Sequence, residues 1–276
     1  MRILVVGDGE IGSAIKANIA NVKDTTIGVC DPPLGQYADQ TVDYNVAHIC
    51  VPVGSSENVP MEEEIFCNMV YDLVKRFRVQ QWIIHSSLTL GIVKKLTIFL
   101  TVWKEVEMIF IPLRGTHGQL ASEIIIDPIY IGIFKPENIH ASWITEYLST
   151  MGFMILNWVS ASEAALAKLV SVVWFGLNIA FVQEIFLLCQ KEGLDFAKVY
   201  TDYARHDRVG KQYYPLTPFP NFVHRPIFYP GVIGGKCVIQ DEILLKPNLV
   251  NPEVIEWCLA NNNRMKEVKI HDKNRE

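Results

Sequence analysis

The stretch Ile3-Leu4-Val5-Val6-Gly7-Asp8-Gly9-Glu10-Ile11-Gly12 passes directly from a short apolar run into a glycine-rich turn. Beyond the turn, Ile11, Ile15 and Ile19 recur at helical spacing and predict an amphipathic helix. A buried strand, a Gly-x-Gly-x-x-Gly turn and a helix in immediate succession are typical of the first unit of a doubly wound α/β sheet. We expect the turn to bind the pyrophosphate of a dinucleotide.

Each residue of the turn has a distinct predicted role. Gly7 makes the tight bend, Gly9 lets the backbone approach the phosphates, and Gly12 allows the helix to pack closely on the strand. Glu10 and Ile11 form the first turn of the helix, whose N-terminal N–H groups would face the pyrophosphate. The alternative is a glycine turn that binds no ligand.

A carboxylate follows the second predicted strand. Thr26–Cys30 ends at Asp31, 19 residues after Gly12. Such a carboxylate accepts hydrogen bonds from the ribose hydroxyls of an adenosine and repels a 2′-phosphate, and no arginine follows it closely. The pattern therefore favours NAD over NADP as the cofactor.

Two further strand ends are expected at the same crevice, because ligands bind at the carboxyl ends of the strands in an open α/β sheet. The third strand ends in Val51, Pro52 and Val53, although Pro52 is also consistent with a strand terminator. The fourth is followed by Ser86 and Ser87, which either line the nicotinamide pocket or cap the next helix.

Short apolar runs alternate with helical patterns along the first half of the chain, as in a parallel sheet covered by helices on both sides. The expected strands are 3–6, 26–30, 47–51, 82–85, 108–111, 130–134 and 153–156. Glu62–Phe77 predicts a helix with a buried stripe at Ile65, Met69, Leu73 and Phe77. We predict an α/β Rossmann domain with a mostly parallel sheet over residues 1–158.

A smaller all-helical domain is expected over residues 159–276, built on one long helix at 162–192. About 30 residues at 1.5 Å each give a length of about 45 Å, more than such a domain needs internally. The predicted apolar side consists of Leu166, Leu169, Val170, Val173, Leu177, Ala180, Phe181 and Leu188. We expect a homodimer through this helix; a transmembrane span is the weaker alternative, because polar residues interrupt the apolar run.

Composition limits the partners and the location. The 276 residues carry 25 Lys and Arg against 30 Asp and Glu, so no basic excess exists to neutralise nucleic-acid phosphates. The six cysteines form no Cys-x-x-Cys pair, which predicts neither a metal site nor a disulfide framework. The N-terminus shows no signal-peptide pattern. We expect a cytoplasmic protein with a small-molecule substrate, no nucleic acid and no membrane.

Near the C-terminus, Gly231-Val232-Ile233-Gly234-Gly235-Lys236-Cys237 places a cysteine just after a glycine pair. Such a turn can direct backbone N–H groups at a ligand, and neighbouring cations and amides activate a thiol. Cys237 is therefore a candidate nucleophile, and a buried structural cysteine is the alternative.

The same segment resembles the UDP-glucose/GDP-mannose 6-dehydrogenase family of the wider 6-phosphogluconate dehydrogenase-like superfamily. In that family the catalytic cysteine lies in a Gly-Gly-x-Cys turn with an aspartate four residues later, as Cys237 and Asp241 do here. The resemblance covers most of the chain. Its other motifs, in the family's order, are GDGEIG at 7–12, VPVG at 51–54, Ser86-Ser87, Ala167-Lys168, Gln183-Glu184, LCQKEGLDFAKVY at 188–200 and Asp207-Arg208-Val209-Gly210.

The resemblance implies an NAD-dependent oxidation of a primary alcohol to a carboxylate in carbohydrate metabolism. Two hydride transfers would pass through a thiohemiacetal and a thioester on the cysteine. Carried over by position, Cys237 is the nucleophile, Lys168 stabilises the oxyanion, and Asp241 positions the hydrolytic water. Gly234 and Gly235 would contact the substrate. An ordinary solvated lysine is the alternative for Lys168.

The chain departs from the family pattern at several places. Val172 stands where the family has an asparagine four residues after the lysine, and Gln240 replaces a lysine. The acidic substrate loop is replaced by 114–119, where Arg114 and His117 are candidate ligands for an anionic substrate. Because about 39 residues follow Cys237, we expect no C-terminal UDP-binding domain.

Two other functions are consistent with these departures. One is a two-electron dehydrogenase of a hydroxy compound that uses Lys168 without covalent catalysis. The other is a dinucleotide-binding protein that has lost catalysis.

Overall fold

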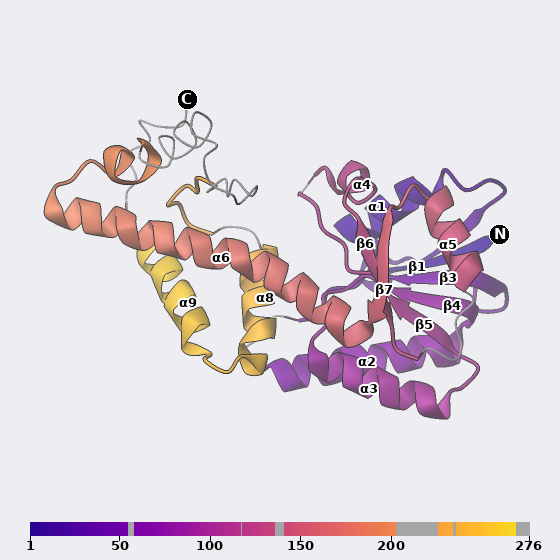
Figure 1. Cartoon of the computed structure of the whole chain (residues 1–276). Helices are drawn as coiled ribbons and strands as arrows, with labels where there is room; N and C mark the ends of the chain where they lie inside the picture. The colour runs from indigo at the N-terminus through magenta and orange to yellow at the C-terminus, as the bar shows by residue number, and fades with distance from the viewer. Residues whose placement is uncertain (55–57, 117, 136–140, 203–225, 234–235, 269–276) are drawn as a thin grey trace, which may run out of the picture. The chain divides into compact units, whose positions relative to one another are not determined.

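The computed structural model describes residues 1–54, 58–116, 118–135, 141–202, 226–233 and 236–268 (Figure 1). The chain divides inside its longest helix into two compact units. Unit 1 comprises Met1–Val170 and Ile243–Asn248, and unit 2 comprises Ser171–Glu242 and Leu249–Glu276. The domain boundary expected at residue 158 lies before this helix and stays a prediction.

Unit 1 contains a seven-stranded sheet with the strand order β2-β1-β3-β4-β5-β6-β7. The strands are β1 Arg2–Val6, β2 Thr26–Cys30, β3 Asp43–Ile49, β4 Arg78–Ile84, β5 Glu107–Phe110, β6 Ile129–Ile133 and β7 Ile155–Ser160. Neighbouring strands pair in parallel, except that β5 and β6 are antiparallel. The predicted doubly wound, mostly parallel sheet is therefore confirmed.

The strands β3 and β4 begin four residues earlier than predicted, because their first residues include polar side chains. Asp43 and Arg78 are register partners at the start of these strands. Their side chains form an exposed ion pair at 2.8 Å. A search for apolar runs misses such a strand start, since its side chains gain their partners only through sheet pairing.

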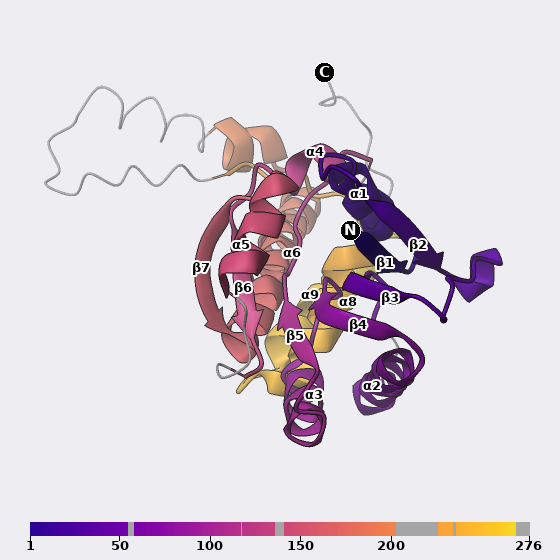
Figure 2. The ribbon, with the colours of Figure 1, turned by 90° about the vertical axis from the view of Figure 1, so that its right-hand side faces the viewer.

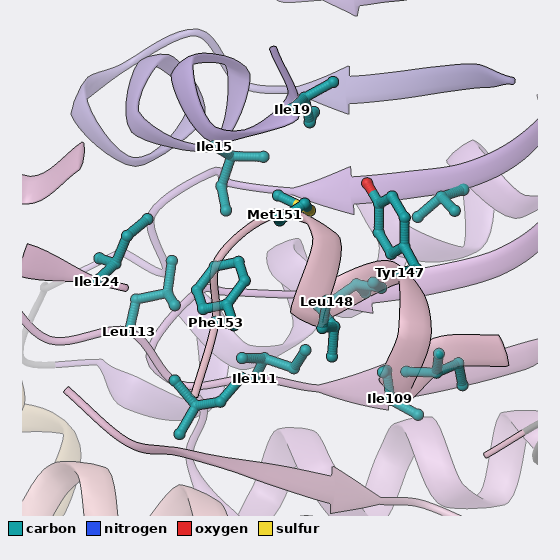
Figure 3. Close-up of a cluster of buried hydrophobic side chains, with 14 of the residues drawn as sticks. Ile15, Ile19, Ile109, Ile111, Leu113, Ile124, Tyr147, Leu148, Met151 and Phe153 are labelled. Atoms are coloured by element: carbon teal, nitrogen blue, oxygen red, sulfur yellow. The ribbon is translucent and has the colours of Figure 1, made fainter. Parts of the chain in front are cut away.

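Helices cover both faces of the sheet (Figure 2). On one face lie α1 (Glu10–Ile19), α4 (Leu120–Glu123) and α5 (Ala141–Thr150), and on the other lie α2 (Val59–Arg76) and α3 (Leu90–Val102). Figure 3 shows the core under the first group, where Ile15 of α1, Ile109 of β5 and Leu148 of α5 are fully buried. Burial on both faces explains why β1 and the second halves of β3 and β4 are mostly apolar.

The helix α2 buries a different stripe from the one predicted. Leu73 and Phe77 are buried as expected, but Ile65 is 53% exposed, and Phe66 and Val70 are buried instead. Each helical residue turns the chain by about 100°, so residues 65 and 77 lie about 120° apart around the axis. A strict four-residue repeat therefore cannot stay on one face over this length.

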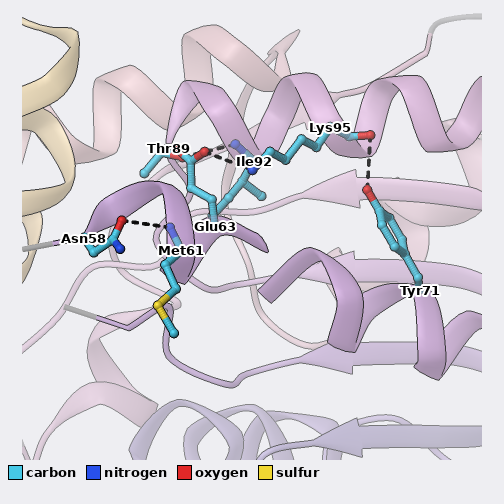
Figure 4. A network of polar contacts seen from close by, with 7 residues as sticks. All are labelled: Asn58, Met61, Glu63, Tyr71, Thr89, Ile92 and Lys95. Atoms are coloured by element: carbon cyan, nitrogen blue, oxygen red, sulfur yellow. Dashed lines mark hydrogen bonds and ion pairs between the residues drawn. The ribbon is translucent and has the colours of Figure 1, made fainter. Parts of the chain in front are cut away.

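A polar network joins α2 to α3 (Figure 4). Glu63 accepts hydrogen bonds from the Thr89 hydroxyl at 2.5 Å and from the Lys95 ammonium at 3.4 Å. The Thr89 hydroxyl oxygen also accepts the N–H of Ile92 at 3.1 Å, and so caps α3. The alternative that Ser86 or Ser87 caps this helix is therefore wrong.

Unit 2 is helical over most of its described residues. The long helix α6 (Ala161–Glu192) runs from unit 1 into unit 2 and is followed by a π-helical turn at Ala197–Asp202, α8 (Lys236–Leu245) and α9 (Glu253–Met265). Close packing of α8 on α6 leaves no room for a Cβ at Gly176, where the buried Glu242 carboxylate lies. Burial raises the pKa of Glu242 to about 7.

The apolar side of α6 is only partly buried. Leu169, Val173 and Ala180 are buried as expected. Six large side chains are between 39% and 53% exposed: Leu166, Val170, Trp174, Phe175, Phe181 and Leu188. Among the described helices, α6 alone is long and apolar enough to cross a membrane, but a helix in the core of a soluble protein meets the same criteria.

Two buried histidines form a hydrogen-bonded chain inside unit 1. The His85 Nδ1 lies 3.0 Å from the Ile111 carbonyl oxygen, the His85 Nε2 lies 2.8 Å from the His48 Nδ1, and the His48 Nε2 lies 2.7 Å from the Tyr147 hydroxyl. A carbonyl only accepts, so His85 must carry its proton on Nδ1. His85 Nε2 then accepts from His48 Nδ1–H, and His48 Nε2 accepts from Tyr147.

Both rings are completely buried, and burial is the largest cause that lowers their pKa values, to about 4 for His85 and well below 6.5 for His48. Histidines in the unfolded chain protonate near pH 6.5. Unfolding therefore takes up protons at acid pH, and each ring lowers the unfolding free energy by about 1.4 kcal/mol per pH unit as the pH falls from 6.5 towards 4.

We predict that both rings are neutral Nδ1–H tautomers and stay so at pH 5.5. The measurement is a pH series of two-dimensional ¹⁵N–¹H spectra that resolve the ring nitrogens. His48→Asn and His85→Asn variants assign the two signals. A ring that titrates near pH 6.5, or that carries its proton on Nε2, would contradict the assignment.

Candidate functional site

The glycine turn between β1 and α1 has no room for larger residues at two positions. Gly7 has a φ of +89°, and its N–H donates to the Cys30 carbonyl oxygen at 3.0 Å. A Cβ on Gly12 would overlap the Gly7 carbonyl oxygen. These contacts hold the start of α1 directly over the end of β1, so that the N-terminus of α1 lies at the carboxyl edge of the sheet.

At Gly9, by contrast, an added Cβ would meet no atom within 4 Å. Gly9 is the N-cap residue of α1 and has no side chain to accept from the first N–H groups of that helix. The helices α2 and α3 are capped by the side chains of Asn58 and Thr89. Open space beside N–H groups without a side-chain N-cap fits an anion such as a pyrophosphate.

Asp31 lies beside this turn, partly exposed, and its Oδ2 accepts the N–H of Asp8 at 2.7 Å. The Asp8 carboxylate forms an ion pair with Lys16 and accepts hydrogen bonds from Gln36 at 3.1 Å and from Ser13 at 3.3 Å. These contacts, the one with Lys16 above all, lower the pKa of Asp8. Lys16 thus balances a negative charge that would oppose phosphate binding.

The contacts of Lys16 and Gln36 with Asp8 were not predicted from the sequence. Lys16 lies in the last turn of α1 with no motif around it, and Gln36 reaches Asp8 from a loop 28 residues later.

Glu10 contacts a neighbouring loop. Its Oε1 accepts the N–H of Gly118 at 2.9 Å, and Ile11 beside it is partly buried. The loop after β5 therefore lies next to the N-terminus of α1. In that loop, Arg114 is 3.9 Å from the Asp127 carboxylate, with both side chains about half exposed. His117, the other candidate substrate ligand, lies outside the described residues.

The strand ends after β3 and β4 are tied together. The buried Ser86 hydroxyl donates to the Val51 carbonyl oxygen at 2.5 Å. Val53 is buried, whereas Pro52 is exposed and Val51 is partly exposed. Ser86 therefore ties the end of β4 to the end of β3 through its hydroxyl group. The expected contact of Ser86 with nicotinamide stays a prediction.

The candidate catalytic residues lie in two places. Lys168 is partly buried in the part of α6 that belongs to unit 1. Cys237 and Asp241 belong to unit 2, one helical turn apart on α8, with Cys237 exposed and Asp241 only 1% exposed. Gly234 and Gly235 lie outside the described residues, as does the motif at 207–210. That Cys237 and Asp241 form one site with Lys168 stays a prediction.

Cys237 differs from the other five cysteines, which are buried. Burial raises the thiol pKa of Cys67 to about 11 and of Cys258 to about 12, and it also raises the pKa values of Cys30, Cys50 and Cys189. Cys237 lies in the first turn of α8, as its second residue. The alternative of a buried structural cysteine is therefore wrong for Cys237.

Comparison with known proteins identifies the second part of the chain. Residues 162–264 match the central domain of the UDP-glucose/GDP-mannose dehydrogenase family. The match begins at the start of α6 and ends at the close of α9, and it includes Lys168, Cys237 and Asp241. No curated protein sequence matches the chain.

Solved structures share the fold at low sequence identity. A UDP-D-ManNAc dehydrogenase from Pyrococcus horikoshii aligns over 97% of this chain and 69% of its own, with a TM-score of 0.72 and 20% identity. The UDP-N-acetyl-mannosamine dehydrogenase of Staphylococcus aureus aligns over 97% and 68%, with a TM-score of 0.68 and 16% identity.

A third structure is similar over most of its own length. It is the 3-hydroxyisobutyrate dehydrogenase of Mycobacterium tuberculosis, which aligns over 96% of this chain and 92% of its own, with a TM-score of 0.59 and 14% identity. These likenesses show the fold. Residues 162–264, fewer than half of the chain, are similar to the central domain of the UDP-glucose/GDP-mannose dehydrogenase family.

Proposed function

We propose that the protein is an NAD-dependent oxidoreductase that acts on a CH–OH group of a sugar-like or other small hydroxy compound. The observation that carries the proposal is the N-terminus of α1, where open space at Gly9 adjoins N–H groups without a side-chain N-cap and the Asp31 carboxylate. Gly7, Gly9 and Gly12 would hold the pyrophosphate, and Asp31 would bind the adenosine ribose. Bound NAD would supply the acceptor for a hydride.

Within this function, we propose covalent catalysis by Cys237. Transfer of a first hydride from the alcohol to NAD would give an aldehyde. The thiolate of Cys237 would then form a C–S bond with the aldehyde carbon, and loss of a second hydride from that carbon to another NAD would leave a thioester. Water would then cleave the C–S bond, release a carboxylate and return the thiol, so that each alcohol reduces two NAD. Lys168 would stabilise the oxyanion, and Asp241 would orient the water. The family match, whose range includes these three residues, supports the assignment.

A two-electron dehydrogenase is the second candidate. Val172 stands in place of the family's asparagine, and the fold likeness extends over 92% of a 3-hydroxyisobutyrate dehydrogenase chain. In this case Lys168 would act without a covalent intermediate. Near two NADH formed per alcohol consumed would support the Cys237 mechanism, and near one would support the alternative. A chain that binds NAD and turns over no hydroxy compound would be the inactive binder.

We also propose a cytoplasmic homodimer that associates through α6. The support is the row of six partly exposed large apolar side chains along this helix. Exposed apolar area of this kind is rare on monomers and common at subunit interfaces.

The first prediction concerns the cofactor. Wild-type protein should bind NAD more tightly than NADP in a calorimetric titration, and Asp31→Asn should weaken NAD binding by about 10- to 100-fold, because hydrogen bonds to a charged acceptor contribute about 1.5–3 kcal/mol. Asparagine keeps an acceptor for the Asp8 N–H, which limits damage to the turn.

Asp39→Asn is the matched control. Asp39 lies on the following loop, is exposed, and accepts hydrogen bonds from Thr41. The same charge is removed there without a change at the glycine turn. Equal loss of NAD affinity in both variants, or equal affinity for NAD and NADP in the wild type, would argue against the proposed site.

The second prediction concerns the thiol. Under native conditions, iodoacetamide should label Cys237 at least tenfold faster than any other cysteine, because the other five are buried with raised pKa values. Peptide mass spectrometry of all six cysteines measures the rates. Cys237→Ser should abolish turnover and leave NAD affinity unchanged. Turnover that survives this substitution would rule out the covalent mechanism and leave the two-electron one.

A further inference from the structure

The backbone that leads into Cys237 is held by two buried side-chain amides. Asn262 of α9 accepts the Ile233 N–H at 2.7 Å through Oδ1 and donates from Nδ2 to the Ile233 carbonyl oxygen at 3.4 Å. Gln183 of α6 donates from Nε2 to the Gly231 carbonyl oxygen at 2.8 Å and lies 3.4 Å from the Asn262 Oδ1. Three polar backbone groups just before Cys237 are thus bound by side chains from other helices.

The orientation of both amides is fixed by these partners. A carbonyl only accepts, so the Gln183 group that faces Gly231 must be the NH₂. Asn262 must present its oxygen to the Ile233 N–H for the same kind of reason. A flipped amide would place two acceptors or two donors together, which would cost about the free energy of a lost hydrogen bond.

Packing stability does not account for Gln183. Its side chain is fully buried, and its Oε1 has no hydrogen-bond partner among the described residues. A buried acceptor without a partner costs about 1–3 kcal/mol. An apolar side chain of similar shape would avoid this cost but could not bind the Gly231 carbonyl. The contact with the backbone is therefore what the glutamine contributes.

A separate set of contacts joins α9 to α6 beside Asn262. Its neighbour Asn261, also buried, donates to the Ala180 carbonyl oxygen of α6 at 3.3 Å and accepts from Arg264 at 3.1 Å. Arg264 in turn lies 3.6 Å from the Glu184 carboxylate. These contacts join α9 to α6 without touching the segment before Cys237.

We propose that Gln183 and Asn262 are positioning residues for Cys237, an inference that rests on the proposed role of this thiol. Ile233 is fixed four residues before the cysteine, and the buried Asp241 lies one helical turn after it on α8. A backbone without such contacts would leave the thiol free to move. Fixed flanks restrict that freedom and place the nucleophile before substrate binds.

The test uses Cys237 as the attachment point of a nitroxide label, since the other cysteines are buried. Full-length wild type, Asn262→Ala and Gln183→Met are labelled, and the electron paramagnetic resonance line shape is recorded well below the unfolding midpoint. We expect the rotational correlation time of the label to fall at least twofold in both variants. Hydrogen exchange of the Ile233 N–H should become at least tenfold faster in Asn262→Ala.

Asn261→Ala is the matched control. It removes an equally buried amide from the same helix, but one that binds α6 and Arg264 rather than the segment before Cys237. It should lower the unfolding midpoint about as much as Asn262→Ala and keep the wild-type line shape. Equal mobility in the Asn261 and Asn262 variants, or an unchanged line shape in Asn262→Ala, would overturn the proposal.

If Asn262→Ala does not fold, the line shape of Gln183→Met is compared with that of Asn261→Ala. Greater mobility of the label in Gln183→Met supports the proposal, and equal mobility overturns it. The readout needs neither NAD nor turnover. Loss of the proposed dehydrogenase function would therefore show in the calorimetric and turnover experiments, whereas failure of the positioning role would show only in the line shape.

Discussion

The packing of Gly12 against the Gly7 carbonyl is the constraint on which the arrangement of the candidate site depends. With no Cβ between them, α1 starts in contact with the end of β1. Three consequences follow from this single contact. The N–H groups of the first helical turn lie at the carboxyl edge of the sheet, the end of β2 brings Asp31 to the Asp8 N–H, and Glu10 reaches the Gly118 N–H of the loop after β5.

Two acidic side chains beside an anion site need an explanation. The Asp8 carboxylate is balanced by Lys16, with further hydrogen bonds from Gln36 and Ser13. The Glu10 carboxylate is engaged by the Gly118 N–H. Both charges are thus bound by the protein itself, while the space at the Cβ position of Gly9 is open and α1 has no side-chain N-cap. The turn is suited to a negatively charged ligand in spite of its acidic residues.

Patterns of neighbouring residues predicted the strands and the glycine turn, but not the hydrogen bonds between residues far apart in the chain. The strands were predicted from seven apolar runs. The glycine turn was predicted from the spacing of its glycines and from the carboxylate after β2. The His48–His85–Tyr147 chain joins a strand, a strand end and a helix up to 99 residues apart. Likewise, Asn262 meets Ile233 from 29 residues away. Neither contact has a short-range pattern in the sequence. The exposure of side chains on α6 could not be predicted either, because it depends on which other residues pack against the helix.

The most direct test of the account is a crystal structure of the protein soaked with NAD. The account predicts pyrophosphate density within hydrogen-bond distance of the N–H groups of Glu10 and Ile11, in the space beside Gly9, with both ribose hydroxyls on Asp31. Dinucleotide density elsewhere on the protein, or none at a concentration well above the dissociation constant from calorimetry, would contradict the assignment of this turn as the cofactor site.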